Sequence, residues 1–185
     1  KISLKLCNGG YPDHDDCSWY HGNWMLLRYL GMVSNPFWHE NFYLEALHRV
    51  LAEKKNNILI VGTADFSMPF LCSSVGIQEL DVCDICYTPL EICDKVSKVF
   101  GYKWNTFRHD INKPLKKKYS VIINDAFLSR FERKESMLER IAEGLDEEGY
   151  YITTLKEGRA NKGGEIEEEL KNNFIEKAVN KYNMS

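Results

Sequence analysis

The chain has 185 residues, of which 44% are hydrophobic and 12% are aromatic, so it is long enough for one domain with a substantial core. A formal net charge of −3 excludes the strongly basic character of a protein that coats nucleic acid or anionic membranes. No apolar run approaches the roughly 20 residues of a membrane span and no signal peptide is evident, so we expect a cytoplasmic protein without a nucleic-acid or membrane partner.

Six cysteines are present, but a chain of this length does not need disulfides, and we expect reduced thiols. Cys83 and Cys86 form a C-x-x-C that permits a redox pair or half a zinc site. Because there is no second C-x-x-C, a buried Cys83 and a helix-side Cys86 are favoured. His14, Cys17 and His21 match no closed zinc pattern, so no metal is expected.

The first 22 residues are irregular and rich in aromatic and ionisable side chains. Trp19, Tyr20 and His21 precede the first strand by too many residues to belong to a sheet. We expect residues 11–22 to fold over a ligand and close one wall of its pocket. In the alternative interpretation, Trp19 plugs the core.

Two helices are predicted next. Residues 24–30 look helical and end at Gly31. Asn35-Pro36 supplies an N-cap and a first-turn proline, and this second helix should run to about Lys54. Its apolar stripe should consist of Tyr43, Leu44, Leu47, Val50 and Leu51. We expect both helices to lie outside the sheet as a cap.

The alternation of strands and helices begins with residues 57–68. Four consecutive aliphatic residues, 58–61, are typical of a strand buried on both faces, and they run directly into Gly62. Asp65 and Ser67 are helix-start residues. Such a strand, tight turn and helix place free backbone N–H groups at the carboxyl edge of a sheet, where doubly wound folds bind ligands.

An acidic residue follows at the end of the second predicted strand. Residues 78–84 end in Asp84, 22 positions after Gly62 (84 − 62). Nucleotide-binding folds hold ribose hydroxyls with a carboxylate about 20 residues after the turn. The turn is not G-x-G-x-x-G, so an ordinary turn without a ligand is the alternative. The combination favours a nucleoside-containing ligand.

The remaining pattern continues the alternation. A helix from Thr88 to Gly101 should turn Val99 and Phe100 inward, and a solvated basic loop, 112–118, should follow the third strand. The later strands are 104–107, 119–124 and 150–155, with helices 134–145 and 165–180.

This alternation predicts an α/β fold with a doubly wound, mainly parallel sheet of order 3-2-1-4-5 in a single domain. Its parts are an N-terminal arm and cap (1–55), a cofactor-binding core (56–155), and a hinge with a C-terminal helix (156–185).

With these motifs in place, residues 56–155 resemble the class I S-adenosylmethionine-dependent methyltransferases. Segments 16–21, 38–39 and 88–90 look like a bacterial subgroup of these enzymes. The resemblance implies S-adenosylmethionine as cofactor and methyl transfer to a small molecule. It also implies which residues hold the cofactor: Gly62, Thr63, Ala64 and Asp65 at the methionine part, Asp84 and Ile85 at the ribose, Asp110 and Ile111 at the adenine, and Asn124 and Asp125 near the methyl group, with Trp19 and Tyr20 as cover.

Methyl transfer needs in-line approach, exclusion of water and sometimes a base. Asp125, His21 and His39 are the candidate bases, and Asp125 is favoured because a strand end delivers it to the cofactor. Each has a purely structural alternative: Asp125 as a cap, His21 on the surface, and His39 in a first helical turn.

Two features depart from the family pattern. The turn has one glycine rather than two or three, and no sixth and seventh strands follow Leu155, which indicates either a shortened chain or a shorter sheet. A nicotinamide-dependent oxidoreductase is a second possibility, disfavoured by the missing glycines and by Asp110. A third is a non-catalytic cofactor-binding or interaction protein of the same fold.

Overall fold

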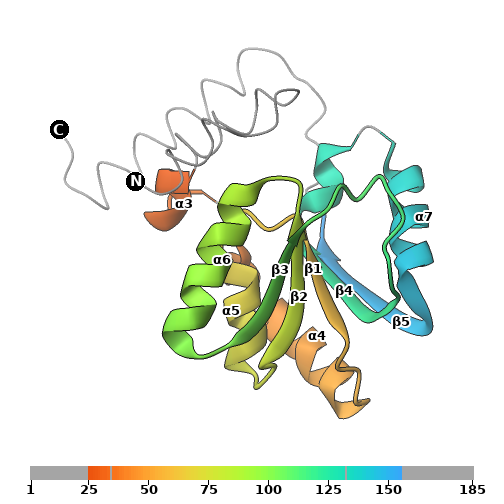
Figure 1. Cartoon of the computed structure of the whole chain (residues 1–185), viewed down its shortest axis with the longest axis horizontal. Coiled ribbons are helices and arrows are strands. Elements are labelled where there is room, and N and C mark those ends of the chain that lie inside the picture. The colour runs from red at the N-terminus through yellow and green to blue at the C-terminus, as the bar shows by residue number, and fades with distance from the viewer. Residues whose placement is uncertain (1–24, 34, 132, 156–185) are drawn as a thin grey trace.

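The computed structural model describes residues 25–33, 35–131 and 133–155 (Figure 1). In chain order its elements are α3 (Met25–Tyr29), the 3₁₀ helix η2 (Pro36–His39), α4 (Glu40–Ala52), β1 (Ile58–Val61), α5 (Ser67–Ser74), β2 (Glu79–Asp84), α6 (Tyr87–Phe100), β3 (Lys103–Arg108), β4 (Tyr119–Asp125), the 3₁₀ helix η3 (Phe127–Arg130), α7 (Lys134–Gly144) and β5 (Leu145–Thr154).

The strands form one sheet in the order β3-β2-β1-β4-β5, and every pairing is parallel. This confirms the predicted order. The buried aliphatic runs of β1 and β4 lie at its centre, as expected where both faces are covered. Because all strands run the same way, their carboxyl ends meet at one edge of the sheet.

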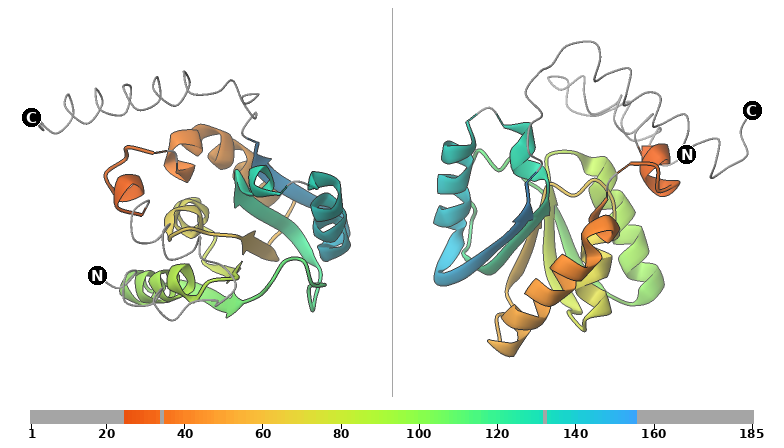
Figure 2. Two further views of the ribbon diagram at one scale, coloured as in Figure 1. Left: turned by 90° about the horizontal axis from the view of Figure 1, so that it is seen from above. Right: turned by 180° about the vertical axis from the view of Figure 1, so that it is seen from behind.

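Helices cover both faces of the sheet (Figure 2). One face carries α4, α5 and α6, which pack with inward side chains of the strands into the larger hydrophobic core. The other face carries α7, whose Met137 and Ile141 pack with Leu59 and Ile122 in a second core. The fold is therefore doubly wound, as predicted.

The expected N-terminal cap is divided between two positions. The apolar stripe of α4, formed by Tyr43, Leu47 and Val50, is buried against the sheet, so this helix belongs to the covering layer. By contrast, α3 has no buried residue, and its Arg28 reaches the turn after β1. Only α3 thus lies where a cap was expected.

The helix boundaries follow the predicted capping residues. The Asn35 side chain accepts a hydrogen bond from the Phe37 N–H at the start of η2. Asp65 accepts one from the Ser67 N–H at the start of α5. Gly101 ends α6 in the left-handed conformation that favours glycine.

The last strand begins earlier than predicted. β5 starts at Leu145, which pairs with Tyr119 before an irregularity, and regular pairing resumes at Tyr150. Gly149 lies inside this irregular part of the strand rather than in a turn before it. The expected absence of a sixth and a seventh strand, the hinge and the C-terminal helix all concern residues outside the described range. Among the described residues, no helix combines the length and apolar character of a membrane span.

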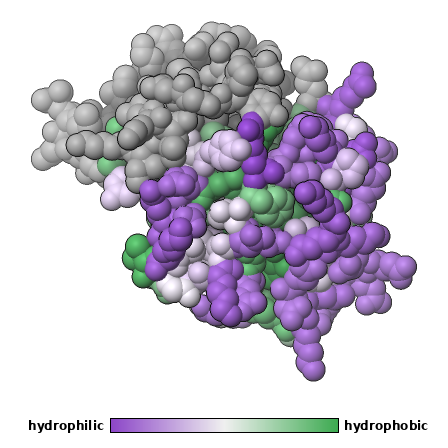
Figure 3. All heavy atoms as spheres, in the orientation of Figure 1, coloured by the Kyte–Doolittle hydropathy of each residue, from purple (hydrophilic) through white to green (hydrophobic). Residues whose placement is uncertain are grey.

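Hydrophilic residues cover most of the described surface in the view of Figure 3, and hydrophobic residues show between them. Two of the exposed hydrophobic residues correct a prediction: Val99 is 80% exposed and Phe100 is 56% exposed. The buried face of α6 instead follows Leu90, Cys93 and Ser97, and Val99 lies on the other side of the helix. Phe100 continues the stripe at the last residue of α6, where its ring contacts those of Phe70 and Tyr102 but stays more than half exposed.

Candidate functional site

Five strand ends form one row across the carboxyl edge of the sheet, which we call the edge row. Asp84 pairs with Arg108, and Asp125 pairs with Thr154. The registers of β1 with β2 and β4, continued past the end of β1, place Gly62 between the two aspartates. From β3 to β5 the edge row reads Arg108, Asp84, Gly62, Asp125 and Thr154.

The side chains of the edge row share the face that carries α4, α5 and α6. Side chains alternate between the faces of a strand. Val82, Ile123 and Ile152 lie two residues before Asp84, Asp125 and Thr154, and all three pack in the core beneath these helices. Two carboxylates therefore flank a glycine on one face, as the sequence predicted for the ligand-binding edge.

Gly62 adopts a φ of +68°, in the left-handed region. A side chain there would also overlap the aromatic ring of Phe127. The N–H of Gly62 extends the strand ladder by donating to the carbonyl of Cys83 at 2.9 Å. This glycine is required by both backbone conformation and packing.

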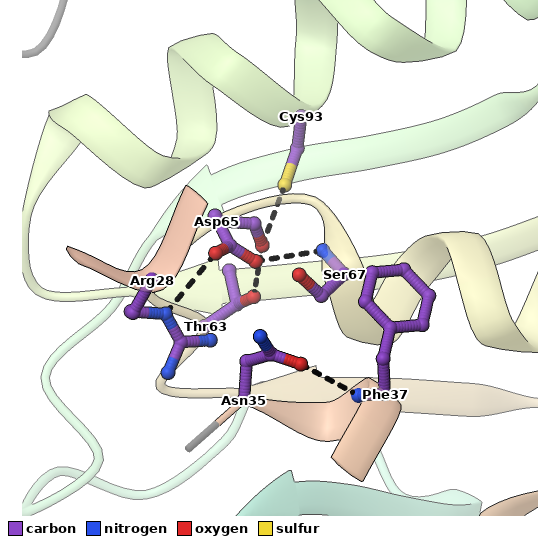
Figure 4. A network of polar contacts seen from close by, with 7 residues as sticks. All are labelled: Arg28, Asn35, Phe37, Thr63, Asp65, Ser67 and Cys93. Carbon is purple, nitrogen blue, oxygen red and sulfur yellow. Dashed lines mark hydrogen bonds and ion pairs between the residues drawn. The ribbon is translucent and has the colours of Figure 1, made fainter. Parts of the chain in front are cut away.

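The rest of the turn is held by its own side chains (Figure 4). The Thr63 hydroxyl donates to the carbonyl of Asp65, and the Cys93 thiol lies 3.6 Å from the same oxygen. Asp65 is 8% exposed, and Oδ1 of its carboxylate accepts from the Ser67 N–H at 2.8 Å. Ala64 is half-buried.

Asp65 also pairs with α3. Arg28 Nε donates to Asp65 Oδ2 at 3.1 Å, and both side chains are nearly buried. Both carboxylate oxygens are therefore engaged, and the side chain of Asp65 stabilises the turn. Sequence reasoning had assigned Asp65 to the cofactor and had not singled out Arg28.

Asp84 is half-buried at the end of β2, and its Oδ1 accepts from the Cys86 N–H at 2.7 Å. Arg108 Nε donates to the carbonyl of Ile85 at 2.9 Å, and its guanidinium carbon lies 4.7 Å from the centre of the Tyr87 ring. The Asp84 carboxylate therefore has two features: it lies in the edge row, and it accepts a hydrogen bond from the residue directly before α6.

Asp110 and Ile111 follow β3 as predicted, but their side chains have different surroundings. Asp110 Oδ1 accepts from the backbone N–H and the side-chain amide of Asn112, both at 3.0 Å. The side chain of Ile111 is 7% exposed and packs in the second core. Only Asp110 therefore keeps a half-exposed polar group at this position.

Asp125 is held by two hydroxyl groups. Tyr43 Oη donates to Asp125 Oδ1 at 2.9 Å, and Thr154 Oγ1 donates to the same oxygen at 2.6 Å. Tyr43 is fully buried, and burial raises the pKa of its hydroxyl, so it stays protonated as a donor. Oδ2 of Asp125 receives no hydrogen bond from the described residues.

Asn124 points to the opposite face, toward β5. Its Nδ2 donates to Tyr151 Oη at 2.7 Å, and its Oδ1 accepts from the Thr153 hydroxyl. The residue is 1% exposed. The structure therefore does not bring the Asn124 side chain into the edge row, although the sequence grouped it with Asp125.

The structure describes one of the two other candidate bases. His39 is half-buried in η2, and His21 lies outside the described residues, as do Trp19 and Tyr20. The described residues contain no group of three or more side chains arranged to hold a metal ion.

The four described cysteines, Cys72, Cys83, Cys86 and Cys93, are buried, and none of them is in a disulfide. Burial raises the pKa of the Cys83 and Cys93 thiols, and it raises that of Cys72 to about 12. Cys83 therefore lacks the stabilised thiolate of a reactive redox cysteine.

Sequence reasoning missed the two hydroxyls around Asp125. Tyr43 was assigned to an apolar stripe, but a buried tyrosine normally finds a hydrogen-bond partner for its hydroxyl. That rule, together with the polar Thr153-Thr154 end of β5, is the signal that could have identified this network.

Neither protein-family models nor curated proteins give a match to the sequence, but solved structures do. Magnesium protoporphyrin IX methyltransferase (ChlM) from Synechocystis PCC 6803, solved with bound SAH, is 15% identical, with a TM-score of 0.54 over 69% of this chain and 66% of that one. The PH0226 protein from Pyrococcus horikoshii OT3 is 19% identical, with a TM-score of 0.51 over 66% and 59%. The [4+2]-cyclase SpnF is 10% identical, with a TM-score of 0.51 over 58% and 42%.

The chain thus spans between 42% and 66% of the length of these three structures. At these identities the similarity shows the fold. Together with the parallel sheet of order 3-2-1-4-5, it shows that the chain has the Rossmann-like fold of class I methyltransferases. The resemblance predicted from the sequence is confirmed at the level of the fold.

Proposed function

We propose that this chain binds S-adenosylmethionine across the edge row and transfers its methyl group to a small-molecule acceptor. The observation that carries the proposal is the placement of the Asp84 and Asp125 carboxylates on either side of Gly62. Asp84 would accept hydrogen bonds from the ribose hydroxyls, and Asp125 would lie near the positive sulfonium. The SAH bound to ChlM supports the same ligand class.

The neighbouring residues have supporting roles in this proposal. The backbone of Gly62, Thr63 and Ala64 approaches the methionine part, while Asp65 holds the turn through Arg28. Ile85 and Ile111 contribute backbone or packing around the adenosine. Asp110 offers its Oδ2, which accepts nothing from the described residues, to the adenine amino group.

The sulfonium methyl is already activated, so the protein must mainly align the acceptor and exclude water. Where the acceptor must lose a proton, Asp125 is the base that we propose, because its Oδ2 is the carboxylate oxygen left unpaired by Tyr43 and Thr154. His39 and His21 remain secondary candidates.

The aromatic cover is a further part of the proposal. Residues 11–22, with Trp19 and Tyr20, would shield the sulfonium from water. Deletion of residues 1–22 should weaken cofactor binding while the protein stays folded by circular dichroism. A folded deletion variant with unchanged affinity would remove the cover from the proposal.

A second candidate is a protein that binds the same cofactor but does not transfer a methyl group. One structure that shares the fold is named a [4+2]-cyclase, so the fold alone does not define methyl transfer. Incubation with S-adenosylmethionine labelled in its methyl group, in the presence of a cell extract of small molecules, separates the two. Transfer of label favours the enzyme, and binding without transfer favours the second candidate.

Calorimetry on the full chain tests the cofactor itself. S-adenosylhomocysteine should bind with one-to-one stoichiometry, and NAD should not. NAD binding without S-adenosylhomocysteine binding would replace the proposal with a nicotinamide-dependent oxidoreductase. We also propose that this activity is in the cytoplasm, in agreement with the four described cysteines, none of which is in a disulfide.

A further inference from the structure

The hydrogen bonds around Asp125 carry an inference about two residues outside the predicted site. The carboxylate is not simply exposed at a strand end, because one of its oxygens receives two hydroxyl donors. Tyr43 comes from α4 and Thr154 from β5, so two separate elements fix one rotamer. A carboxylate held in this way presents its other oxygen in a constant direction.

Thr154 links this carboxylate to the backbone as well. Its Oγ1 donates to Asp125 Oδ1 and accepts from the Ala126 N–H at 3.0 Å. Ala126 has a φ of +53°, which is unfavourable for a residue with a side chain. The Thr154 hydroxyl therefore connects the carboxylate to a strained residue that follows β4 directly.

The Tyr43 hydroxyl has further polar neighbours besides Asp125. Its hydroxyl lies 3.0 Å from the carbonyl of Asn124 and 3.2 Å from Thr154 Oγ1, in addition to its contact with Asp125. The residue is fully buried. Tyr43 thus ties the ends of β4 and β5 to the covering helix at the position where the edge row needs a fixed negative charge.

We propose that Tyr43 and Thr154 are positioning residues that hold Asp125 as a fixed counter-charge to the sulfonium, so that the site discriminates S-adenosylmethionine from its neutral product. The inference rests on the proposed function. A negative charge at a constant position stabilises the cationic cofactor more than the thioether left after transfer, which helps the product to leave.

The affinity ratio of two ligands tests this directly. S-adenosylmethionine and S-adenosylhomocysteine differ only in the methyl group and the positive charge. A substitution that weakens the binding of both ligands equally therefore leaves the ratio of their dissociation constants unchanged. Measured by calorimetry on the full chain, Asp125→Asn should shift this ratio against S-adenosylmethionine by about tenfold. Thr154→Val and Tyr43→Phe should shift it in the same direction by roughly threefold to tenfold.

Two controls separate positioning from stability. Thr154→Ser keeps the hydroxyl and should keep the wild-type ratio. Tyr151→Phe removes a hydroxyl from the same strand pair, but on the face of Asn124, and should also leave the ratio unchanged. Because Thr154 is half-buried near the end of β5, its variants test the inference even if Tyr43→Phe does not fold.

The outcomes are distinct. If both ligands bind and the ratio in Thr154→Val equals that of the wild type, the positioning role is wrong while the proposed cofactor stands. An equal shift in Tyr151→Phe also overturns it. If the wild type binds neither ligand, the proposed function fails and the inference fails with it.

Discussion

At Gly62 the backbone and the packing both exclude a larger residue. Its φ is +68°, and an added Cβ would overlap the ring of Phe127. Gly101 has a similar φ of +74°, but no atom lies within 4 Å of the position that its Cβ would take. Comparison of the two glycines therefore separates backbone strain from overpacking.

Gly62→Ala should lower the free energy of unfolding by about 2–5 kcal/mol, since left-handed strain of about 1–2 kcal/mol adds to overpacking of about 1–3 kcal/mol. Gly101→Ala should lower it by the strain alone, about 1–2 kcal/mol. Urea denaturation measures both. Equal losses would show that the Phe127 ring moves aside without cost.

At the scale of elements, the loop before β4 is tied to the sheet by a buried carboxylate. Asp81 on β2 accepts from Tyr119 Oη at 2.7 Å, from Asn105 Nδ2 at 2.9 Å and from Lys117 Nζ at 2.9 Å. The sequence predicted that residues 112–118 form a solvated basic loop. Lys117 departs from that prediction because its charge pairs with Asp81 and lies over the Tyr119 ring.

Stability should depend on pH through Asp81. Burial opposes its ionisation, but hydrogen bonds from Lys117, Asn105 and Tyr119 leave its pKa below the ordinary value. A lowered folded-state pKa gives stability that is present above the unfolded value of about 3.9 and is lost as pH falls through the folded value. Urea unfolding at several pH values should show this loss in the wild type.

Asp81→Asn should remove that part of the pH dependence and lower the free energy of unfolding at pH 7 by about 1–3 kcal/mol, because hydrogen bonds to a charged group are lost. Asp94→Asn on the surface of α6 is the matched control. If Asp81→Asn loses stability on acidification as steeply as the wild type, another carboxylate is responsible.

The contact between α3 and the turn after β1 is a second link between elements. Arg28 and Asp65 form a nearly buried ion pair, while Asp65 also accepts from the Ser67 N–H at the start of α5. Removal of one partner from a buried pair leaves an uncompensated charge. The pair should therefore couple α3 to the turn in the stability of the protein.

A double-mutant cycle of Arg28→Gln and Asp65→Asn measures this coupling. Asp65→Asn keeps an acceptor for the Ser67 N–H, so this hydrogen bond is retained. We expect a coupling energy of about 1–3 kcal/mol in urea unfolding. Additive losses, with no coupling, would show that α3 is held to the turn by other contacts.

At the scale of the whole molecule, the arrangement of the sheet could be predicted because β1 and β4 contain short aliphatic runs and every strand ends at, or directly before, a glycine or polar residue. The same punctuation predicted that Gly62, Asp84 and Asp125 would meet at one edge. The roles of Asp65 and Asn124 could not be predicted, since their partners Arg28 and Tyr151 are distant in sequence.

Three other predictions were wrong or incomplete, each for a reason that concerns a particular residue. Val99 and Phe100 look apolar enough for a core, but Val99 lies on the other side of α6 from the buried stripe, and Phe100 is the last residue of the helix. Tyr43 fits an apolar stripe by spacing, and only the tertiary fold reveals that its hydroxyl reaches the ends of two strands. Gly149 resembles a turn residue, yet pairing of β5 begins before it.

The central claim is that the carboxylate of Asp84 accepts hydrogen bonds from the ribose hydroxyls of S-adenosylmethionine. Asp84→Asn is the most direct variant, because the amide oxygen can still accept from the Cys86 N–H and start α6. The variant loses the charge and one of the two acceptor oxygens that a ribose diol needs. Asp94→Asn removes the same charge from a half-exposed position on α6, where Asp94 pairs with Lys98, and serves as the control.

The deciding measurement is the dissociation constant of S-adenosylhomocysteine by calorimetry for the wild type and these two variants. We expect Asp84→Asn to weaken binding by about 1.5–3 kcal/mol, roughly tenfold to 150-fold, with little change in stability. Asp94→Asn should bind as the wild type does. Wild-type affinity in Asp84→Asn would contradict the proposed placement of the cofactor.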